Sequence, residues 1–386
     1  MNIQQMNLIK MIRCVVHNAP CEALTDPNYE EISSIARSHK LSAFLFESLP
    51  FLPAEQRPNP EIQTQWKRLY RSLLVVEANQ RYEFERLIDA FDNAGISTLP
   101  VKGFAAADLY PRSVLRSMSD LDILYDETKQ ENAACLMQEL GYRAESVGNG
   151  NTDQFFSDMG IHVEMHRSLY EDRMPEAAKP YLESFFDFAE SGRNCHYALF
   201  QADSYLYLIL HTYKHFIFAG TGIRSVLDVY FCKDLPMDRE YLLSKCRLFG
   251  IEKFLLELER LSEVWFSDAE ASTLSEQLGT YIADGGVYGS EENKLRSEMR
   301  RAEGGRRDGK LKYVLRRFFL PYRSMKNEYH VLQRLPFLLP LLWIYRAFFA
   351  LLHRRKKLTN EIHNLSNYDK DHAASISELM NALEIH

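Results

Sequence analysis

The sequence has few cysteines for its length, and none of them belongs to a recognisable motif. The six cysteines among 386 residues are scattered, and no pair has Cys-x-x-Cys spacing. This spacing argues against a structural zinc site and against a dithiol redox motif. Residues 1–18 also lack the long apolar stretch of a secretory leader. Together these absences predict free thiols and a reducing, cytoplasmic location.

Acidic residues are scarce in one part of the chain. Residues 294–357 contain 18 Lys and Arg against 4 Asp and Glu, a local balance of +14, although the whole chain carries −7. A basic segment on an acidic body predicts a polyanionic partner. Nucleic acid and an anionic membrane surface both fit this prediction.

The most informative stretch of the chain is LPVKGFAAADLYPRSVLRSMSDLDILY, residues 99–125. Its pattern predicts three elements: a strand at 97–101, a helix at 104–110 and a strand at 120–124. Side chains i and i+2 of a strand lie on the same face. Asp120 and Asp122 are therefore predicted to project together, with the apolar residues of that strand on the opposite face.

Two carboxylates on one strand face repel each other unless a cation or a proton lies between them. Mg²⁺ fits this position, because it prefers oxygen ligands and also binds substrate phosphates. The turn at Gly103 would offer backbone N–H groups to a phosphate. These parts predict a metal-dependent phosphoryl or nucleotidyl transfer site. The alternative is that Asp120 caps a turn and Asp122 is a solvated edge residue.

A second alternating strand is predicted at IHVEMH, residues 161–166. His162, Glu164 and His166 share one face of it, and the apolar residues share the other. A His-x-Glu-x-His face can hold zinc, but a strand with an Asp-x-Asp pair nearby favours oxygen ligands and Mg²⁺. The alternative is a solvent-exposed polar strand face.

The motifs of the first stretch resemble those of a known group of enzymes. They run in the order Lys102-Gly103, a tyrosine, then Arg116-x-x-x-Asp120-x-Asp122. This order resembles the nucleotidyltransferase superfamily, which is built around the DNA polymerase β-like fold. More narrowly, it is similar to a bacterial family of uncharacterised nucleotidyltransferases. Phe104 replaces the serine that usually follows the glycine.

The resemblance implies roles for individual residues. It places the third carboxylate at Glu164, which would join Asp120 and Asp122 around one or two Mg²⁺ ions or act as a base. It implies a nucleoside triphosphate as donor, contacted by four residues: Lys102, Gly103, Arg116 and Ser119. The acceptor is not identified by the sequence.

Two pairs of polar residues lie four positions apart on helices predicted at 204–218 and 223–232: His211 with His215, and Arg224 with Asp228. Such spacing places both members of a pair on one helical face. The narrower family shows a similar pattern, so the resemblance extends over residues 99–233. Together with His166, these residues are predicted to bind substrate or to align the domains. The alternative is that they are hydrogen-bonded structural residues.

The segment LPFLLPLLWIYRAFFALL, residues 335–352, is strongly apolar. It holds only 18 residues, with two prolines and one arginine, whereas a spanning helix needs about 20 apolar residues. A full membrane span is therefore not expected. Two readings stay open: a membrane-surface helix assisted by the basic residues at 354–357, and a buried helix that closes the core.

These observations predict an α+β protein with a small mixed sheet of nucleotidyltransferase type and extensive helical regions. The predicted parts are a helical region at 1–95, a catalytic domain at 96–200, a helical domain at 201–282, a basic, partly apolar region at 283–357 and a polar tail at 358–386. The predicted activity is Mg²⁺-dependent transfer of a nucleoside monophosphate from an NTP such as ATP. The alternative is a non-catalytic nucleotide-binding or assembly protein of a polysaccharide-synthesis or membrane-associated complex.

Overall fold

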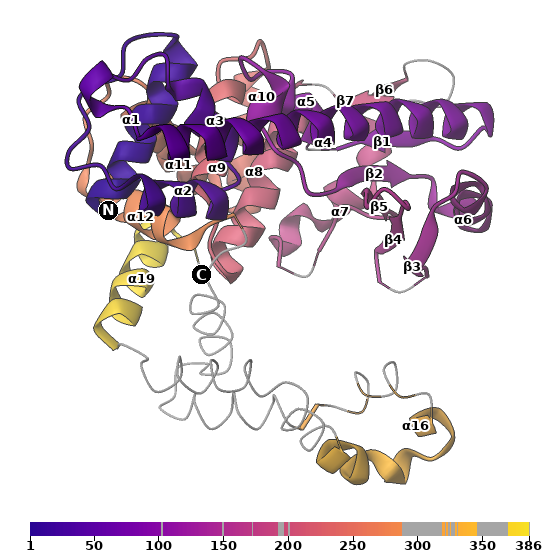
Figure 1. Cartoon of the computed structure of the whole chain (residues 1–386). Coiled ribbons are helices and arrows are strands. Elements are labelled where there is room, and N and C mark those ends of the chain that lie inside the picture. The colour runs from indigo at the N-terminus through magenta and orange to yellow at the C-terminus, as the bar shows by residue number, and fades with distance from the viewer. Residues whose placement is uncertain are drawn as a thin grey trace.

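Helices form most of the protein, and a small sheet lies beside the far end of the long helix α4 (Pro60–Asn93) (Figure 1). The computed structural model describes residues 1–101, 103–148, 150–171, 173–191, 197–199, 201–287, 319–320, 322, 325, 329, 331–345 and 370–385. The helices and the mixed sheet confirm the predicted α+β class.

The main sheet has five strands in the order β1-β2-β5-β4-β3. Strands β2 and β5 run parallel, and the other neighbours are antiparallel. The strands are β1 (Thr98–Pro100), β2 (Leu121–Tyr125), β3 (Arg143–Ser146), β4 (Thr152–Phe156) and β5 (His162–His166). A second, two-stranded sheet pairs β6 (Ala189–Ser191) with β7 (Tyr197–Leu199). The parallel pair at the centre of the main sheet brings together two strands that are distant in sequence.

One face of the main sheet is buried because its strand residues alternate. Leu121, Ile123 and Tyr125 of β2 are at most 1% exposed. They belong to a hydrophobic cluster with residues of α4 and of α6 (Gln130–Glu139). The polar residue between them, Asp122, therefore lies on the opposite face, as the alternation predicts.

The N-terminal region is helical, as the sequence predicts, and asparagines begin three of its helices. The side chains of Asn2, Asn28 and Asn59 each accept a backbone N–H from the first turn that follows. Pro60 then occupies the first turn of α4, where a missing N–H has no cost. The other elements of this region are α1 (Ile3–His17), α2 (Tyr29–Ser38), α3 (Ser42–Ser48) and the 3₁₀ turn η1 (Ala54–Gln56).

A second group of helices follows the sheets and packs on the first group. These helices are α8 (Gln201–Phe218), α9 (Ile223–Cys232), α10 (Arg239–Phe249), α11 (Glu252–Phe266) and α12 (Thr273–Gly285). One hydrophobic core contains Met11 and Phe44 from the first group and Phe254 and Leu258 from the second. The division of the chain into domains stays a prediction, but the helices of residues 1–95 and 201–282 share this core.

Several short elements differ from the predicted ones. The helix predicted at 104–110 is α5 (Gly103–Ala107), and the strand predicted at 120–124 is β2, which begins one residue later. The strand predicted at 161–166 is β5, which also begins one residue later. Strand β4 begins at Thr152, which pairs with His166 of β5. The remaining short elements before α8 are η2 (Ser113–Leu115), η3 (Glu127–Lys129), η4 (Glu176–Ala178), α7 (Lys179–Glu183) and η5 (Phe185–Phe188).

The last helix of the chain packs onto the helical body. Helix α19 (Lys370–Ala382) contacts α12. Ile376, Leu379 and Met380 are buried in the main core. The predicted polar tail therefore contains a helix that is anchored by its apolar face.

The described part of the apolar segment at 335–352 is exposed or half-buried. It includes η6 (Pro336–Leu338), preceded by α16 (Val331–Arg334). Phe337, Leu341 and Ile344 are 71%, 62% and 65% exposed. In the described part of the chain, no helix has the length and apolarity needed to cross a membrane. Residues 346–357, which include the basic residues at 354–357, lie outside the described residues.

A buried histidine ties α2 to the helices that carry the functional site. The backbone N–H of Ile223, at the start of α9, donates to Nδ1 of His39 over 3.0 Å. The Nε2 atom of His39 lies 3.1 Å from the carbonyl oxygen of Ala283 in α12. Nδ1 therefore accepts and Nε2–H donates, which requires a neutral ring. Burial lowers the pKa of His39 to about 4.

We expect acid to destabilise the fold through His39. The unfolded-state pKa of a histidine is about 6.5, so the unfolded chain binds more protons than the folded one between that pH and about 4. The stability that His39 contributes is complete above about pH 6.5 and decreases as the pH falls, by up to about 1.4 kcal/mol per unit. Chemical denaturation at several pH values should show a lower free energy of unfolding for His39→Gln than for wild type near neutral pH. As the pH falls, this free energy should decrease less steeply in the variant than in wild type. Parallel declines for the two proteins would contradict this.

Candidate functional site

Three carboxylates meet on the polar face of the sheet. In the parallel register of β2 and β5, Asp122 lies directly opposite Glu164. Ligand atoms of Asp122, Glu164 and His166 lie within 4.8 Å of one another, and so do those of Asp120, His162 and Glu164. The structure thus brings Glu164 beside the two aspartates, although more than 40 positions separate it from them in the sequence.

His166 holds the carboxylate of Asp122 in place. Its Nε2 atom lies 2.8 Å from Oδ1 of Asp122 and 3.6 Å from Oε2 of Glu164. Its Nδ1 atom lies 3.2 Å from the hydroxyl of Thr152 on β4. Asp122 and His166 side chains are only 7% and 5% exposed, whereas Glu164 is 23% exposed. Glu164 is therefore the carboxylate of this group that is more open to the cavity.

The donor atoms of this cluster fit a divalent cation. Three carboxylates this close repel one another, so a cation between them relieves an unfavourable charge arrangement. Carboxylate oxygens suit Mg²⁺, and the nearby imidazoles are also acceptable to Mn²⁺ or zinc. The residues that would hold the ion are Asp120, Asp122 and Glu164, with His162 and His166 at the margins of the cluster.

Arg116 lies in a buried ion pair instead of facing the cavity with a free guanidinium. Its Nε and Nη2 atoms donate to both carboxylate oxygens of Asp228 over 2.8 and 3.0 Å, and its Nη1 donates to the carbonyl of Gly103 over 3.0 Å. Arg116 and Asp228 are 5% and 3% exposed. Although burial opposes the charge, Asp228 raises the pKa of Arg116 above its ordinary value. The Tyr110 hydroxyl also donates to Asp228, over 2.6 Å.

The triphosphate contact predicted for Arg116 stays a prediction; Arg116 lines the cavity, and its described bonds run to Asp228 and to the carbonyl of Gly103. Its donors are used to hold Gly103 and to link the turn at Gly103 to α9, because Asp228 belongs to that helix. Burial raises the pKa of Tyr110 well above its ordinary value, so this hydroxyl stays protonated and keeps donating to Asp228.

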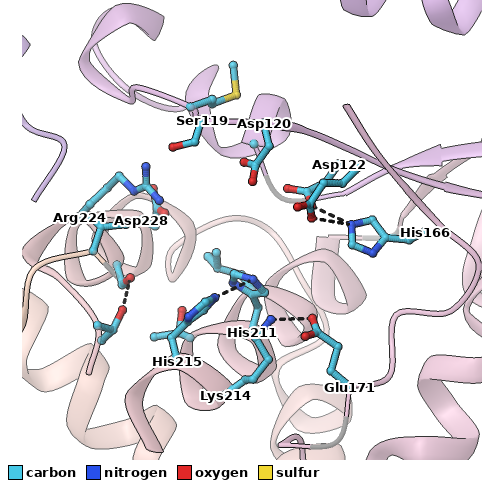
Figure 2. A pocket seen from close by; sticks show the side chains of 18 of the residues that line it. Ser119, Asp120, Asp122, His166, Glu171, His211, Lys214, His215, Arg224 and Asp228 are labelled. Carbon is cyan, nitrogen blue, oxygen red and sulfur yellow. Dashed lines mark hydrogen bonds and ion pairs between the residues drawn. The ribbon is translucent and has the colours of Figure 1, made fainter. Parts of the chain in front are cut away.

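A second wall of polar residues faces the carboxylates from α8 and α9 (Figure 2). The Nε2 atoms of His211 and His215 lie 3.1 Å apart. Lys214, on the same helix, forms an ion pair of 2.5 Å with Glu171, in the loop after β5. Arg224 of α9 donates to the carbonyl of Ser117 over 2.7 Å. The predicted pairs on these helices thus lie across from the predicted metal ligands.

A cavity of about 390 Å³ separates the two walls. Most of the predicted site residues line it: Gly103, Arg116, Ser119, Asp120, Asp122, Glu164, His166, His211, His215, Arg224 and Asp228. Lys102 lies outside the described residues. Thus the residues predicted from separate stretches of the sequence converge on one cavity.

Sequence reasoning missed seven polar residues of the cavity: Thr152, Gln154, Glu171, Thr212, Lys214, Thr221 and Ser225. Two of them follow from the sheet register, in which Thr152 pairs with His166 and Gln154 pairs with Glu164. Lys214 is three positions after His211 on α8, so the helical period could have found it. Glu171 lies in a loop and has no local sequence signal.

Comparison with known proteins agrees with this site. A search of curated proteins and a search of solved structures each gave no significant match. A model of the family described as uncharacterised nucleotidyltransferase matches residues 25–267, more than half of the chain. That range contains both walls of the cavity. The protein is therefore a member of the uncharacterised nucleotidyltransferase family and an enzyme of the nucleotidyltransferase type.

Proposed function

We propose that the protein transfers a nucleoside monophosphate from an NTP to an acceptor with the help of Mg²⁺. The observation that carries this proposal is the meeting of Asp120, Asp122 and Glu164 at the edge of one cavity. Transfer of this kind works mainly by positioning the reactants and by stabilising charge on phosphate oxygens. The opposing polar wall supplies groups that can position the second reactant.

The three carboxylates have distinct proposed roles. Asp120 and Asp122 hold one or two Mg²⁺ ions, and Glu164 completes the metal site or accepts the proton of the attacking group. When bound, the metal supplies positive charge to the phosphates of the donor. His166 keeps the Asp122 carboxylate in a fixed orientation through its 2.8 Å hydrogen bond. It is in this sense a positioning residue.

The nucleotide phosphates are proposed to lie near the turn at Gly103 and near Ser119. Both residues line the cavity beside Asp120. Arg116 positions this turn through its bond to the Gly103 carbonyl. Lys102 remains a predicted phosphate contact, on the resemblance alone. The acceptor stays open, and nucleic acid is among the candidates.

A second proposal concerns an anionic membrane surface. Phe337, Leu341 and Ile344 are exposed and spaced four and three positions apart, which places them on one helical face. We call these three residues the apolar ridge. The basic residues at 354–357 follow soon after in the sequence, and each would add about 1 kcal/mol near an anionic surface. The proposed location is therefore the cytoplasm, at the inner face of a membrane.

The carboxylate proposal predicts a loss of metal-dependent nucleotide binding in Asp122→Asn. Removing one charged ligand should weaken Mg·ATP binding by about tenfold or more and abolish pyrophosphate release. Calorimetry with each Mg·NTP and an assay of pyrophosphate measure the two effects. Asp158→Asn, in the exposed turn after β4, is the control and should behave as wild type. Equal Mg·NTP affinity in Asp122→Asn would refute the site, and wild-type binding without pyrophosphate release would favour the non-catalytic alternative.

The buried pair predicts a large loss of stability in Asp228→Ala. The guanidinium of Arg116 would remain buried without its carboxylate, which costs about 3–5 kcal/mol. Removing all three polar groups, with Arg116→Met, Asp228→Leu and Tyr110→Phe, should recover much of this loss. Urea denaturation measures both. Asp108→Ala, which breaks an exposed ion pair with Arg81, should cost less than about 1 kcal/mol. A similarly small loss in Asp228→Ala would contradict the argument.

The membrane proposal predicts that the full-length protein sediments with anionic liposomes at low salt and is released at high salt. Phe337→Asp combined with Ile344→Asp should abolish sedimentation, because it places charge on the apolar ridge. Leu248→Asp is the matched control, since Leu248 of α10 is also 65% exposed. Sedimentation that survives the double substitution, or that is absent for wild type at low salt, would overturn this proposal.

A further inference from the structure

One turn of α8 presents three nitrogen-bearing side chains to the cavity: His211, Lys214 and His215. We call them the α8 nitrogen cluster. Figure 2 shows the cluster across the cavity from Asp120 and Asp122. The cluster belongs to a helix, whereas the carboxylates lie on the sheet side of the cavity. The two groups are therefore structurally separate.

The two imidazoles of the cluster share one proton between their facing atoms. Their Nε2 atoms are 3.1 Å apart, and their ring centroids are 4.4 Å apart at an angle of 67°. One Nε2 must therefore donate and the other accept, since two lone pairs or two N–H groups would repel. In this arrangement the ring that accepts is neutral. If both Nε2 atoms carried a proton, each would need an acceptor other than its neighbour.

The surroundings of the pair decide which ligand could supply that acceptor. Lys214 is paired with Glu171, and the ring of Tyr207 lies 6.3 Å from that of His211. The other charged or titratable residues that line the cavity are Arg116, Asp120, Asp122, Glu164, His166, Arg224 and Asp228. Asp228 is neutralised by Arg116, and the remaining carboxylates form the predicted metal cluster. An anion between the walls would thus meet metal charge on one side and nitrogen donors on the other.

We propose that the α8 nitrogen cluster is a binding subsite for a phosphate group of a reactant. Phosphate oxygens accept from several donors at once, and charge-assisted hydrogen bonds are the strong ones. A phosphate seated between His211 and His215 would accept from both Nε2–H groups, with Lys214 as a third donor. This inference rests on the proposed nucleotidyl transfer for its reactants. The phosphate is either the pyrophosphate end of the donor or a phosphate carried by the acceptor.

The subsite can be tested without metal, so that its failure is distinct from failure of the carboxylate site. Wild-type protein is titrated by calorimetry with inorganic pyrophosphate in the presence of a chelator. We expect binding that is weakened about tenfold or more in His215→Gln and in His211→Gln, since each loses one charge-assisted hydrogen bond. His17→Gln, on α1, and Asp122→Asn should both keep this binding. Thermal denaturation confirms that each variant is folded.

Sulfate is a second probe, because its charge does not change near neutral pH. Binding of sulfate should be more than tenfold tighter at pH 6 than at pH 8 in wild type, since both Nε2 atoms can donate to the anion only when both imidazoles are protonated. This pH dependence should be weaker in His215→Gln, which keeps only one of the two imidazoles. Absence of metal-free anion binding in wild type, or equal binding in wild type and both histidine variants, would overturn the proposal.

The two sources of the phosphate are separated by adding Mg·ATP to the wild-type protein. If the subsite takes the pyrophosphate end of the donor, inorganic phosphate should compete with Mg·ATP for binding, and His215→Gln should weaken the binding of Mg·ATP. If it takes a phosphorylated acceptor, phosphate and Mg·ATP should bind together, and Mg·ATP affinity should be the same in His215→Gln. Either result supports a phosphate subsite and assigns its reactant.

Discussion

The parallel pairing of β2 with β5 is the constraint on which the site depends. In this register Asp122 lies opposite Glu164, and the apolar residues on either side of each are buried beneath the sheet. A shift of either strand by one residue would turn its carboxylates into the core and its apolar residues into the cavity. Burial of Leu121, Ile123 and Val163 therefore fixes the positions of the polar atoms as firmly as any contact among those atoms.

The second constraint is the buried link between Arg116 and Asp228, which joins the sheet side of the cavity to its helical side. Arg116 holds the Gly103 carbonyl, and Asp228 belongs to α9. His39 fixes the start of the same helix through Ile223. Helix α9 is thus held at its start by His39 and near its middle by Arg116, and the bond to Arg116 connects it to the sheet side of the cavity. The separation between the metal ligands and the histidines of α8 follows from these connections.

The sequence predicted those features that depend on local periodicity. The two-residue period placed Asp120, Asp122 and Glu164 on polar strand faces, and the helical period placed His211 beside His215. It could not predict that Asp228 pairs with Arg116, because 112 positions separate them and no local pattern encodes the contact. Motif order predicted a phosphate contact for Arg116, and the buried ion pair with Asp228 is a further contact that motif order does not encode. Glu171 was missed because a loop has no periodicity.

The position of α19 has a consequence for the synthesis of the protein. Its apolar residues Ile376, Leu379 and Met380 are buried in the same core as Leu8, Met11 and Ile12 of α1. During translation the first helices therefore emerge long before the residues that complete their packing. The nascent helical body stays partly open until α19 has been made. Truncations within α19 would hold the protein in that incomplete state.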